Sequence, residues 1–113
     1  MNLLKKKVTK AEIFAEYTKI INGVLELSPR ELEVFSFLLV KDSEGVSNVN
    51  HKDIRTELIK KFSITAPNLS HYLATLKEKG LIVRGEKGWV INDVIRPIIK
   101  DGVFELRFIL EVV

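Results

Sequence analysis

The chain has 113 residues, of which 46% are apolar and 29% charged, so it can bury a modest core and is too apolar for a disordered protein. It has no cysteine, which excludes disulfides, thiolate nucleophiles and zinc–thiolate sites and agrees with a reducing compartment. The net charge is +3, and no apolar run approaches the roughly 20 residues of a membrane-spanning helix. We therefore expect a cytoplasmic protein with no membrane contact.

The charge is unevenly distributed along the chain. Residues 1–10 carry four lysines and no acid, and residues 11–49 have a net charge of −4. Residues 50–88 have a net charge of +4, and residues 89–113 a net charge of −1. Positive charge therefore concentrates in a basic N-terminal arm, residues 1–8, and in the third quarter of the chain. Attraction to phosphate needs such clustering, although lysines that only solvate exposed faces give the same pattern.

The first predicted element is a helix over residues 10–22. Thr9 and Glu12 have the spacing of a capping box, and Asn22–Gly23 predicts the helix end, because both residues tolerate the left-handed conformation. Between these ends apolar side chains recur at helical spacing: Ile13, Phe14, Tyr17, Ile20 and Ile21.

The second predicted helix has the clearest local signal. Ser28 is an N-cap serine, Pro29 occupies the first helical position, and Glu31 the third. The helix is expected to run to about Lys41, with an apolar face made of Leu32, Phe35, Leu38 and Leu39. A short β-compatible piece follows at residues 46–49.

Two further helices are predicted within residues 50–80, joined by a tight turn at Ser63–Ile64. Asn50 is the expected cap of the first helix and Thr65 that of the second, where Pro67 falls in the first turn and needs no N–H donor. Gly80 ends the second helix. The two helices share a small predicted core: Ile54, Leu58, Ile64, Leu69, Leu73 and Leu76.

From residue 81 the apolar period becomes that of strands. Residues 81–91 predict a hairpin that turns at Arg84 to Gly88. Pro97 interrupts residues 94–100, whose pattern leaves helix and loop open. Residues 102–113 alternate apolar and other side chains and predict a C-terminal strand.

A helix, a tight turn, a second helix and a hairpin, in this order, make a winged helix-turn-helix. We therefore predict an α+β fold, mainly α, with a two- to three-stranded wing sheet and a C-terminal β-strand. Residues 9–113 form a single domain, with the helix-turn-helix at 50–80 and the wing at 81–91. Because a major groove admits a helix, we expect a sequence-specific protein for double-stranded DNA, a transcription regulator that reads the groove with residues 66–79.

The outward side of that helix supplies the predicted base contacts. Its side chains are small or uncharged and polar, with one imidazole, and Asn68 suits the donor–acceptor pair of adenine. Thr65 and the amides of the helix start suit phosphate, as do nearby cations. The predicted DNA-binding residues are Thr65, Pro67, Asn68, Ser70, His71, Thr75, Lys52, Lys77, Arg84 and Lys87. Each also has an ordinary interpretation: local capping for Asn68, a plain surface histidine for His71, and solvation for the cations. Tyr72 and Trp89 are assigned to the core.

A family resemblance is carried by LSPRELEVFSFLL and by KDIRTELIKKFSITAPNLSHYLATLKEKGLIVR, over roughly residues 27–91. Both look like the MarR-type winged-helix regulators. The resemblance implies that APNLSHYLATL is the recognition helix and that Arg84 and Lys87 lie on the wing. LSPREL alone also resembles LuxR-type effector domains, which lack a wing. MarR-type proteins dimerise through long terminal helices, whereas this chain has one short N-terminal helix and a β-like tail.

Several alternatives stay open. The outward face carries no arginine, which favours a winged-helix module that binds another protein, or an accessory factor of replication initiation from a phage or mobile element. A homodimer can form through the N-terminal helix or the C-terminal strand, or that strand pairs within the monomer, for example with residues 24–27. No enzymatic activity, cofactor or metal site is expected, because His51 and His71 lack metal-binding spacing and the glycines form no phosphate loop.

Overall fold

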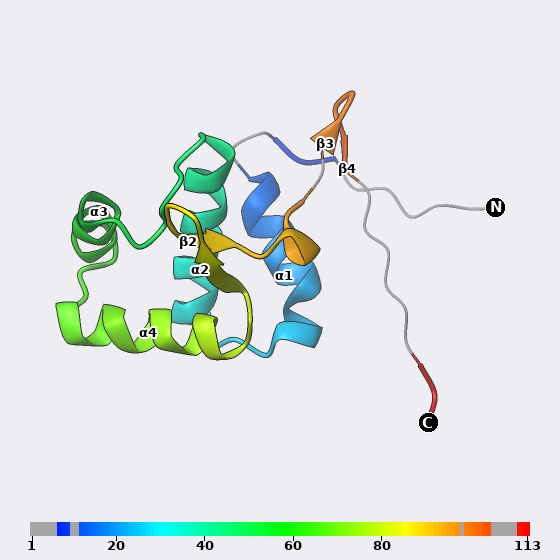
Figure 1. The fold of residues 1–113 in the computed structure, drawn as a ribbon. Coiled ribbons are helices and arrows are strands. Elements are labelled where there is room, and N and C mark those ends of the chain that lie inside the picture. Colours follow the sequence, from blue (N-terminus) through cyan, green and yellow to red (C-terminus); the bar gives the residue numbers. More distant parts are fainter. Residues whose placement is uncertain (1–6, 10–11, 98, 105–110) are drawn as a thin grey trace.

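The computed structural model describes residues 7–9, 12–97, 99–104 and 111–113. Within these residues the fold is α+β and mainly helical, as predicted (Figure 1). Its elements are, in chain order, α1 (Ile13–Leu25), α2 (Pro29–Ser43), α3 (Lys52–Phe62), α4 (Ala66–Glu78), β1 (Ile82–Gly85), β2 (Gly88–Ile91), the short 3-10 helix η1 (Asp93–Ile95), β3 (Ile99–Lys100) and β4 (Val103–Phe104). None of the helices in this part of the chain is long and apolar enough to cross a membrane.

Helix α1 begins later and ends later than the predicted helix over residues 10–22. Its N-cap is Glu12, whose side chain makes no capping hydrogen bond with the described residues, so the predicted capping box with Thr9 is wrong. Thr9 instead contributes its carbonyl oxygen, which accepts a hydrogen bond of 3.1 Å from the Glu12 N–H. The helix continues through Gly23, and Glu26 closes it in the left-handed conformation at φ 54°.

The side chain of Asn22 accounts for this extension. Its Oδ1 accepts a hydrogen bond of 2.9 Å from the Leu27 N–H, and its Nδ2 donates one of 3.2 Å to the Leu27 carbonyl oxygen. Because the carboxamide holds the connector to α2, Asn22 stays inside the helix and does not end it. Of the predicted apolar stripe, Tyr17 and Ile21 are buried, whereas Ile20 is 53% exposed.

Helix α2 lies at the centre of the core and begins as predicted. Ser28 Oγ accepts a hydrogen bond of 3.3 Å from the Glu31 N–H, and the Glu31 carboxylate accepts one of 2.8 Å from the Ser28 N–H. Both ends of the capping box are therefore formed, and the helix extends to Ser43. It contacts α1, α4 and β2, and it buries Val34, Phe35, Leu38 and Leu39.

Helix α3 is capped by His51 and not by Asn50, so the predicted cap is wrong. His51 Nδ1 accepts a hydrogen bond of 3.1 Å from the Asp53 N–H. The Asn50 carboxamide is used elsewhere, because its Oδ1 accepts a hydrogen bond of 3.1 Å from Arg55 Nη1. The helix ends at Phe62, and its C-cap Ser63, in the left-handed conformation at φ 52°, turns the chain sharply into α4.

Helix α4 has the predicted start. Thr65 Oγ1 accepts a hydrogen bond of 3.2 Å from the Asn68 N–H, and Pro67 lies in the first turn. Gly80 follows the helix with φ 74°, a conformation that favours glycine. The predicted shared core of α3 and α4 is confirmed. Ile64 is half-buried, and the other predicted members are buried: Ile54, Leu58, Leu69, Leu73 and Leu76.

The hairpin of β1 and β2 is tighter than predicted. Arg84 pairs with Trp89 and Gly85 with Gly88, so only Glu86 and Lys87 form the turn. The β-compatible residues before α3 do not form a strand. They contact this sheet through a backbone hydrogen bond of 2.9 Å from the Val49 N–H to the Trp89 carbonyl oxygen, and through one of 3.1 Å from the Trp89 N–H to Asn48 Oδ1.

The chain beyond the hairpin returns to α1. β3 and β4 pair with each other in antiparallel register, so the part of the predicted C-terminal strand at residues 103–104 pairs within the chain. Its suggested partner is wrong, because residues 24–25 belong to α1. Residues 105–110 of that predicted strand lie outside the described residues, and residues 111–113 belong to no strand. Phe104 meets Tyr17 edge-on, with ring centroids 5.0 Å apart, and the Tyr17 hydroxyl donates to the Ile95 carbonyl oxygen.

Candidate nucleic-acid interface

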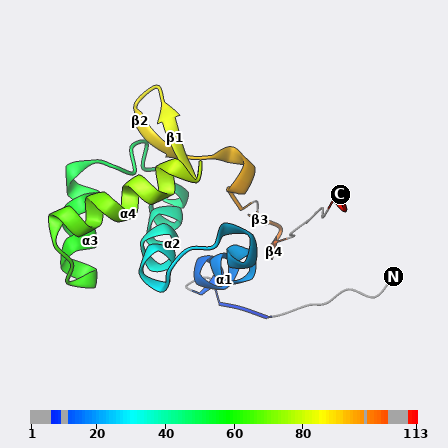
Figure 2. The same cartoon turned by 90° about the horizontal axis from the view of Figure 1, so that it is seen from below.

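Helix α4 lies at the edge of the molecule, with one side buried and the other open (Figures 1 and 2). Leu69, Leu73 and Leu76 hold the inner side against the core. Viewed from below, α4 crosses in front of α2 and α3, and no described element covers it (Figure 2). We define the outer face of α4 by five of its exposed residues, Pro67, Asn68, Ser70, His71 and Ala74; Ala66 and Glu78, at the two ends of the helix, are exposed as well.

The polar groups of Asn68 and His71 are available to a ligand. Neither the Asn68 carboxamide nor the His71 imidazole makes a hydrogen bond with the described residues. The contact of the His71 ring is with Tyr72, at 6.5 Å between centroids. Local capping is therefore not the role of the Asn68 side chain. Thr65 by contrast acts as a cap, since its hydroxyl oxygen holds the Asn68 N–H.

An arginine that the sequence interpretation did not select reaches this face. Arg55, on α3, donates from Nη2 to Ser70 Oγ at 2.8 Å, and from Nη1 to Asn50 Oδ1. Its guanidinium is thereby fixed beside the outer face, although the residue belongs to another helix. Arg55 and Ser70 are separated by 15 positions in the sequence, which leaves no local pattern that predicts the contact.

Thr75 does not lie on the outer face. It is half-buried, and its hydroxyl donates to the His71 carbonyl oxygen at 3.3 Å. The pKa of Glu31 lies below its ordinary value, chiefly because the backbone N–H of Ser28 stabilises the carboxylate, with contributions from the Ser28 and Thr75 hydroxyls and from Lys79. Thr75 therefore lies on the side of α4 that faces Glu31, and it is less exposed than Asn68 and His71.

Lys77, at the end of α4, meets the hairpin through Trp89. The Lys77 ammonium lies 4.1 Å from the centroid of the Trp89 ring, and the Arg84 guanidinium carbon lies 5.8 Å from it. Trp89 is half-buried at the border of the core, as is Tyr72, so their assignment to the core holds only in part. The sequence alone does not predict that the tryptophan of the hairpin contacts one cation on α4 and another on β1.

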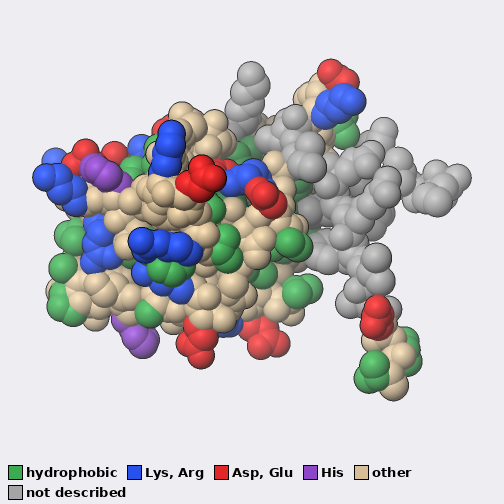
Figure 3. Space-filling model, in the orientation of Figure 1, with side chains coloured by type: hydrophobic (Ala, Val, Ile, Leu, Met, Phe, Trp, Pro, Cys, Tyr) green, Lys and Arg blue, Asp and Glu red, His purple; other side chains and the backbone are tan. Residues whose placement is uncertain are grey.

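The cations near α4 lack acidic partners in the described structure. None of the following has a described carboxylate oxygen within 4.0 Å: Lys52, Lys60, Lys61, Lys77, Arg84 and Lys87. Elsewhere cations are paired, as Arg30 is with Glu33 at 2.9 Å and Lys41 with Glu57 at 2.9 Å. Lysine and arginine side chains lie over the hairpin and the neighbouring helices, with acidic side chains among them and along the lower edge of the view (Figure 3). Residues 50–88, which include this surface, carry a net charge of +4.

Lys79 has a different role from its neighbours. Its ammonium donates at 2.8 Å to the carbonyl oxygens of Leu25 and Glu26, which end α1. These carbonyls have no partner within their own helix, so Lys79 satisfies them and ties α4 to α1.

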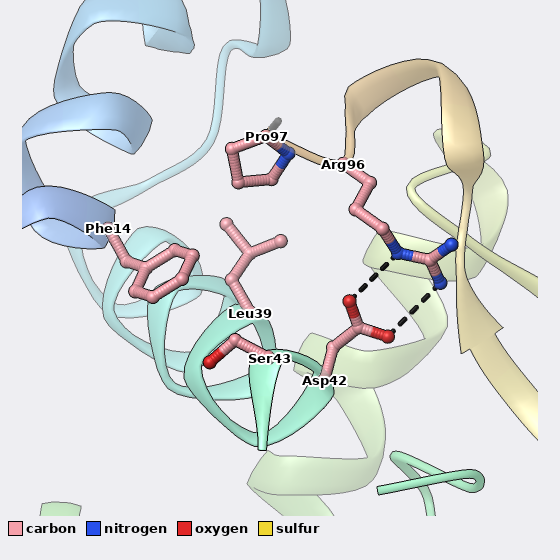
Figure 4. A pocket seen from close by; sticks show the side chains of 6 residues that line it. All are labelled: Phe14, Leu39, Asp42, Ser43, Arg96 and Pro97. Atoms are coloured by element: carbon pink, nitrogen blue, oxygen red, sulfur yellow. Dashed lines mark hydrogen bonds and ion pairs between the residues drawn. The ribbon is translucent and has the colours of Figure 1, made fainter. Parts of the chain in front are cut away.

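A shallow pocket of about 290 Å³ lies away from α4, between α1, the end of α2 and the segment after η1 (Figure 4). Phe14, Leu39 and Pro97 give it apolar walls. Its charged groups satisfy each other, because Arg96 Nε and Nη2 bind the two oxygens of Asp42 at 2.8 and 3.1 Å. This pairing raises the pKa of Arg96 above its ordinary value. The pair anchors the segment after the hairpin to α2.

Among the described residues, no group of three or more His, Asp and Glu side chains is placed to hold a metal ion. Comparisons with protein-family models, with characterised proteins and with solved structures found no match to this chain.

Proposed function

We propose that this protein is a winged helix-turn-helix protein that binds double-stranded DNA and regulates transcription. α3 and α4 act as the helix-turn-helix, α4 as the recognition helix and the β1–β2 hairpin as the wing. The observation that carries the proposal is the uncovered outer face of α4, on which Asn68 and His71 make no hydrogen bond with the described residues. Polar groups held on a rigid helix without internal partners suit the edges of bases.

The dimensions of α4 fit this role. Its 13 residues give a length of about 20 Å, and a helix of about 10–12 Å diameter fits the major groove, which is about 12 Å wide. Short side chains such as Ser70 and Ala74 let the helix approach closely. Asn68 is suited to adenine, and Arg55, held beside Ser70, brings a guanidinium that can bind guanine or phosphate.

The charges around α4 support phosphate contact. Lys52, Lys77 and Lys87 have no described carboxylate partner, so their charge is available to the DNA backbone. Neutralising phosphates releases condensed counterions, and the logarithm of the affinity then falls by about 0.9 per contact for each tenfold rise in salt. Phosphate contacts alone give no sequence preference, which we assign to the outer face of α4.

Duplex binding at several salt concentrations tests the proposal. Anisotropy of a labelled duplex selected from a random pool should give a steep salt slope between about 50 and 200 mM salt. The double variant Asn68→Ala/His71→Ala should lose most of the preference for the selected sequence, because two base contacts of about 1–3 kcal/mol each are removed. Lys19→Ala, an exposed cation on α1, serves as control and should bind normally. Equal binding of selected and scrambled duplexes by the wild type would contradict the proposal.

A second candidate is a protein-interaction module, including an accessory factor of replication initiation. The outer face of α4 itself carries no lysine or arginine, which favours a protein partner over DNA. Absence of duplex binding at about 50 mM salt, where phosphate attraction is strong, would support this candidate.

Dimerisation bears on both candidates, because two recognition helices on a two-fold site bind more selectively than one. Helix α1 offers an apolar surface for it, since Ile20 is 53% and Val24 is 65% exposed. We propose a homodimer through α1 or through the C-terminal segment. Mass measurement in solution, with Ile20→Ser/Val24→Ser as the variant, tests the first of these.

A further inference from the structure

Trp89 is the meeting point of the recognition helix and the hairpin. Lys77, from α4, and Arg84, from β1, both lie over its ring. Arg84 is the cross-strand partner of Trp89, and the next pair on the same side of the hairpin, Ile82 with Ile91, is buried. That side of the hairpin therefore packs into the core at its base and presents Trp89 to the end of α4 at its tip.

Lys77 and Arg84 both lie against the Trp89 ring and have no described carboxylate oxygen within 4.0 Å. Two such cations repel each other, and the negative face of the indole offsets part of this repulsion. An anion that contacts both cations would offset the remaining repulsion. The two cations are thus already positioned to bind a negatively charged ligand, so binding requires little rearrangement of their side chains.

We infer that Lys77, Arg84 and Trp89 form one binding site for a backbone phosphate of nucleic acid, in which Trp89 is a positioning residue. The inference rests on the proposed function, and it adds that the helix and the hairpin contact the same phosphate. Trp89 acts through the two cations and does not stack on a base. The place of a stacked base above the ring is taken by the Lys77 ammonium, 4.1 Å from the centroid.

Lys87 provides a matched control within the same hairpin. It is an exposed cation in the turn and makes no contact with the Trp89 ring. If Lys77 and Arg84 share a phosphate, their substitutions are coupled, whereas Lys77 and Lys87 act independently. A double-mutant cycle measures this coupling directly.

The cycle is run with the full chain and a mixed-sequence duplex, by anisotropy at several salt concentrations. Lys77→Ala and Arg84→Ala should each weaken binding by roughly three- to tenfold, and the double variant by clearly less than the product. The salt slope of that double variant should fall by about one, the value for a single phosphate. Lys77→Ala/Lys87→Ala should instead show the full product and a larger fall in slope.

Trp89 itself is tested without changing charge. Trp89→Leu should weaken binding and abolish the coupling of Lys77 with Arg84, while Trp89→Phe, which keeps an aromatic face, should retain much of both. Thermal melting of each variant checks that it is folded. If Trp89→Leu does not fold, the coupling in the wild-type and Trp89→Phe backgrounds still decides the question.

The outcomes separate this inference from the proposed function. If the wild type binds duplex and Asn68→Ala/His71→Ala loses sequence preference, but Lys77 and Arg84 contribute independently, the shared phosphate site is overturned and the proposed function stands. If the wild type binds no duplex at about 50 mM salt, both are overturned. Because Trp89 is the single tryptophan of the chain, its emission gives a second readout. It should change on duplex binding in the wild type and stay unchanged in Lys77→Ala/Arg84→Ala.

Discussion

Arg55 on α3 donates a hydrogen bond of 2.8 Å to the hydroxyl oxygen of Ser70 on α4. The outer face of α4 has no arginine of its own, yet a guanidinium lies beside it. Asn50, just before α3, holds the same guanidinium from the other side. The lack of arginine on the recognition face is the feature that favours a protein partner. That argument is weaker in the folded protein, because Arg55 supplies a guanidinium from α3.

Arg55→Ala should weaken duplex binding by about tenfold, the equivalent of one contact of about 1.4 kcal/mol, because a fixed charged donor at the α4 face is lost. Arg55→Lys should restore only part of the loss, since an ammonium lacks the fork that reaches Ser70 and Asn50 together. Anisotropy at constant salt measures both. Arg30→Ala is the control, because Arg30 is paired with Glu33 on α2. Equal effects of Arg30→Ala and Arg55→Ala would contradict a specific role for Arg55.

The hairpin is held to the loop before α3 by a glycine that has no room for a side chain. Gly88 has φ +125°, and a Cβ built on it would lie 2.4 Å from Asn48 Cγ. The Asn48 carboxamide cannot simply move, because its Oδ1 accepts hydrogen bonds from the N–H groups of Asn50 and Trp89. Gly88→Ala should therefore lower the free energy of unfolding by about 2–3 kcal/mol.

Gly23→Ala is the matched control for this prediction. Gly23 lies inside α1, and a Cβ built there meets nothing within 4 Å. Because alanine favours the helix, this variant should raise the free energy of unfolding by about 0.5–1 kcal/mol. Urea denaturation of both variants makes the comparison, and a Gly88→Ala protein as stable as wild type would show that the hairpin is not packed in this way.

The sequence predicted those features that depend on neighbouring residues. The capping box of Ser28 and Glu31, the Thr65 cap and the hairpin each need only a few adjacent side chains, and each is formed. The buried side of α4 followed from the spacing of Leu69 and Leu73, since helical periodicity decides it.

Features that depend on distant contacts could not be predicted. Asn50 is a residue type that favours helix caps, but Arg55 binds its carboxamide and His51 occupies the capping position of α3. Asn22 followed by glycine predicts a helix end, but its side chain binds the backbone of Leu27 and the helix continues. The candidate site has the same limitation, because the positions of Thr75 against α2 and of Trp89 against Lys77 depend on how helices pack, which no local spacing encodes.

The Tyr17 hydroxyl links stability to pH in the alkaline range. Burial raises the pKa of Tyr17 above its ordinary value of about 10, so the folded protein keeps this proton after the unfolded chain has lost it. The contribution is fully present below about pH 10 and is lost as pH rises through the folded pKa. Tyr17→Phe should cost about 1 kcal/mol at pH 7, since the Ile95 carbonyl oxygen loses its donor. The difference between wild type and variant should shrink above about pH 10, and a constant difference in urea denaturation from pH 8 to 11 would contradict this assignment.

Lys77 and Lys79 stand two residues apart on α4 and should separate DNA binding from stability. Lys79 satisfies the last carbonyls of α1, so Lys79→Met should lower the free energy of unfolding by about 1–2 kcal/mol through the loss of charged hydrogen bonds at an exposed site. Because its charge is already engaged there, the salt slope of duplex binding should stay unchanged in Lys79→Met.

Lys77→Ala should have the opposite effects, since the Lys77 ammonium contacts only the Trp89 ring within the described structure. It should reduce the salt slope by at most about one and leave the unfolding free energy within about 0.5 kcal/mol of wild type. Urea denaturation measures the stability of both variants, and anisotropy measures their salt slopes of duplex binding. A reduced salt slope in Lys79→Met would instead show that Lys79 contacts phosphate.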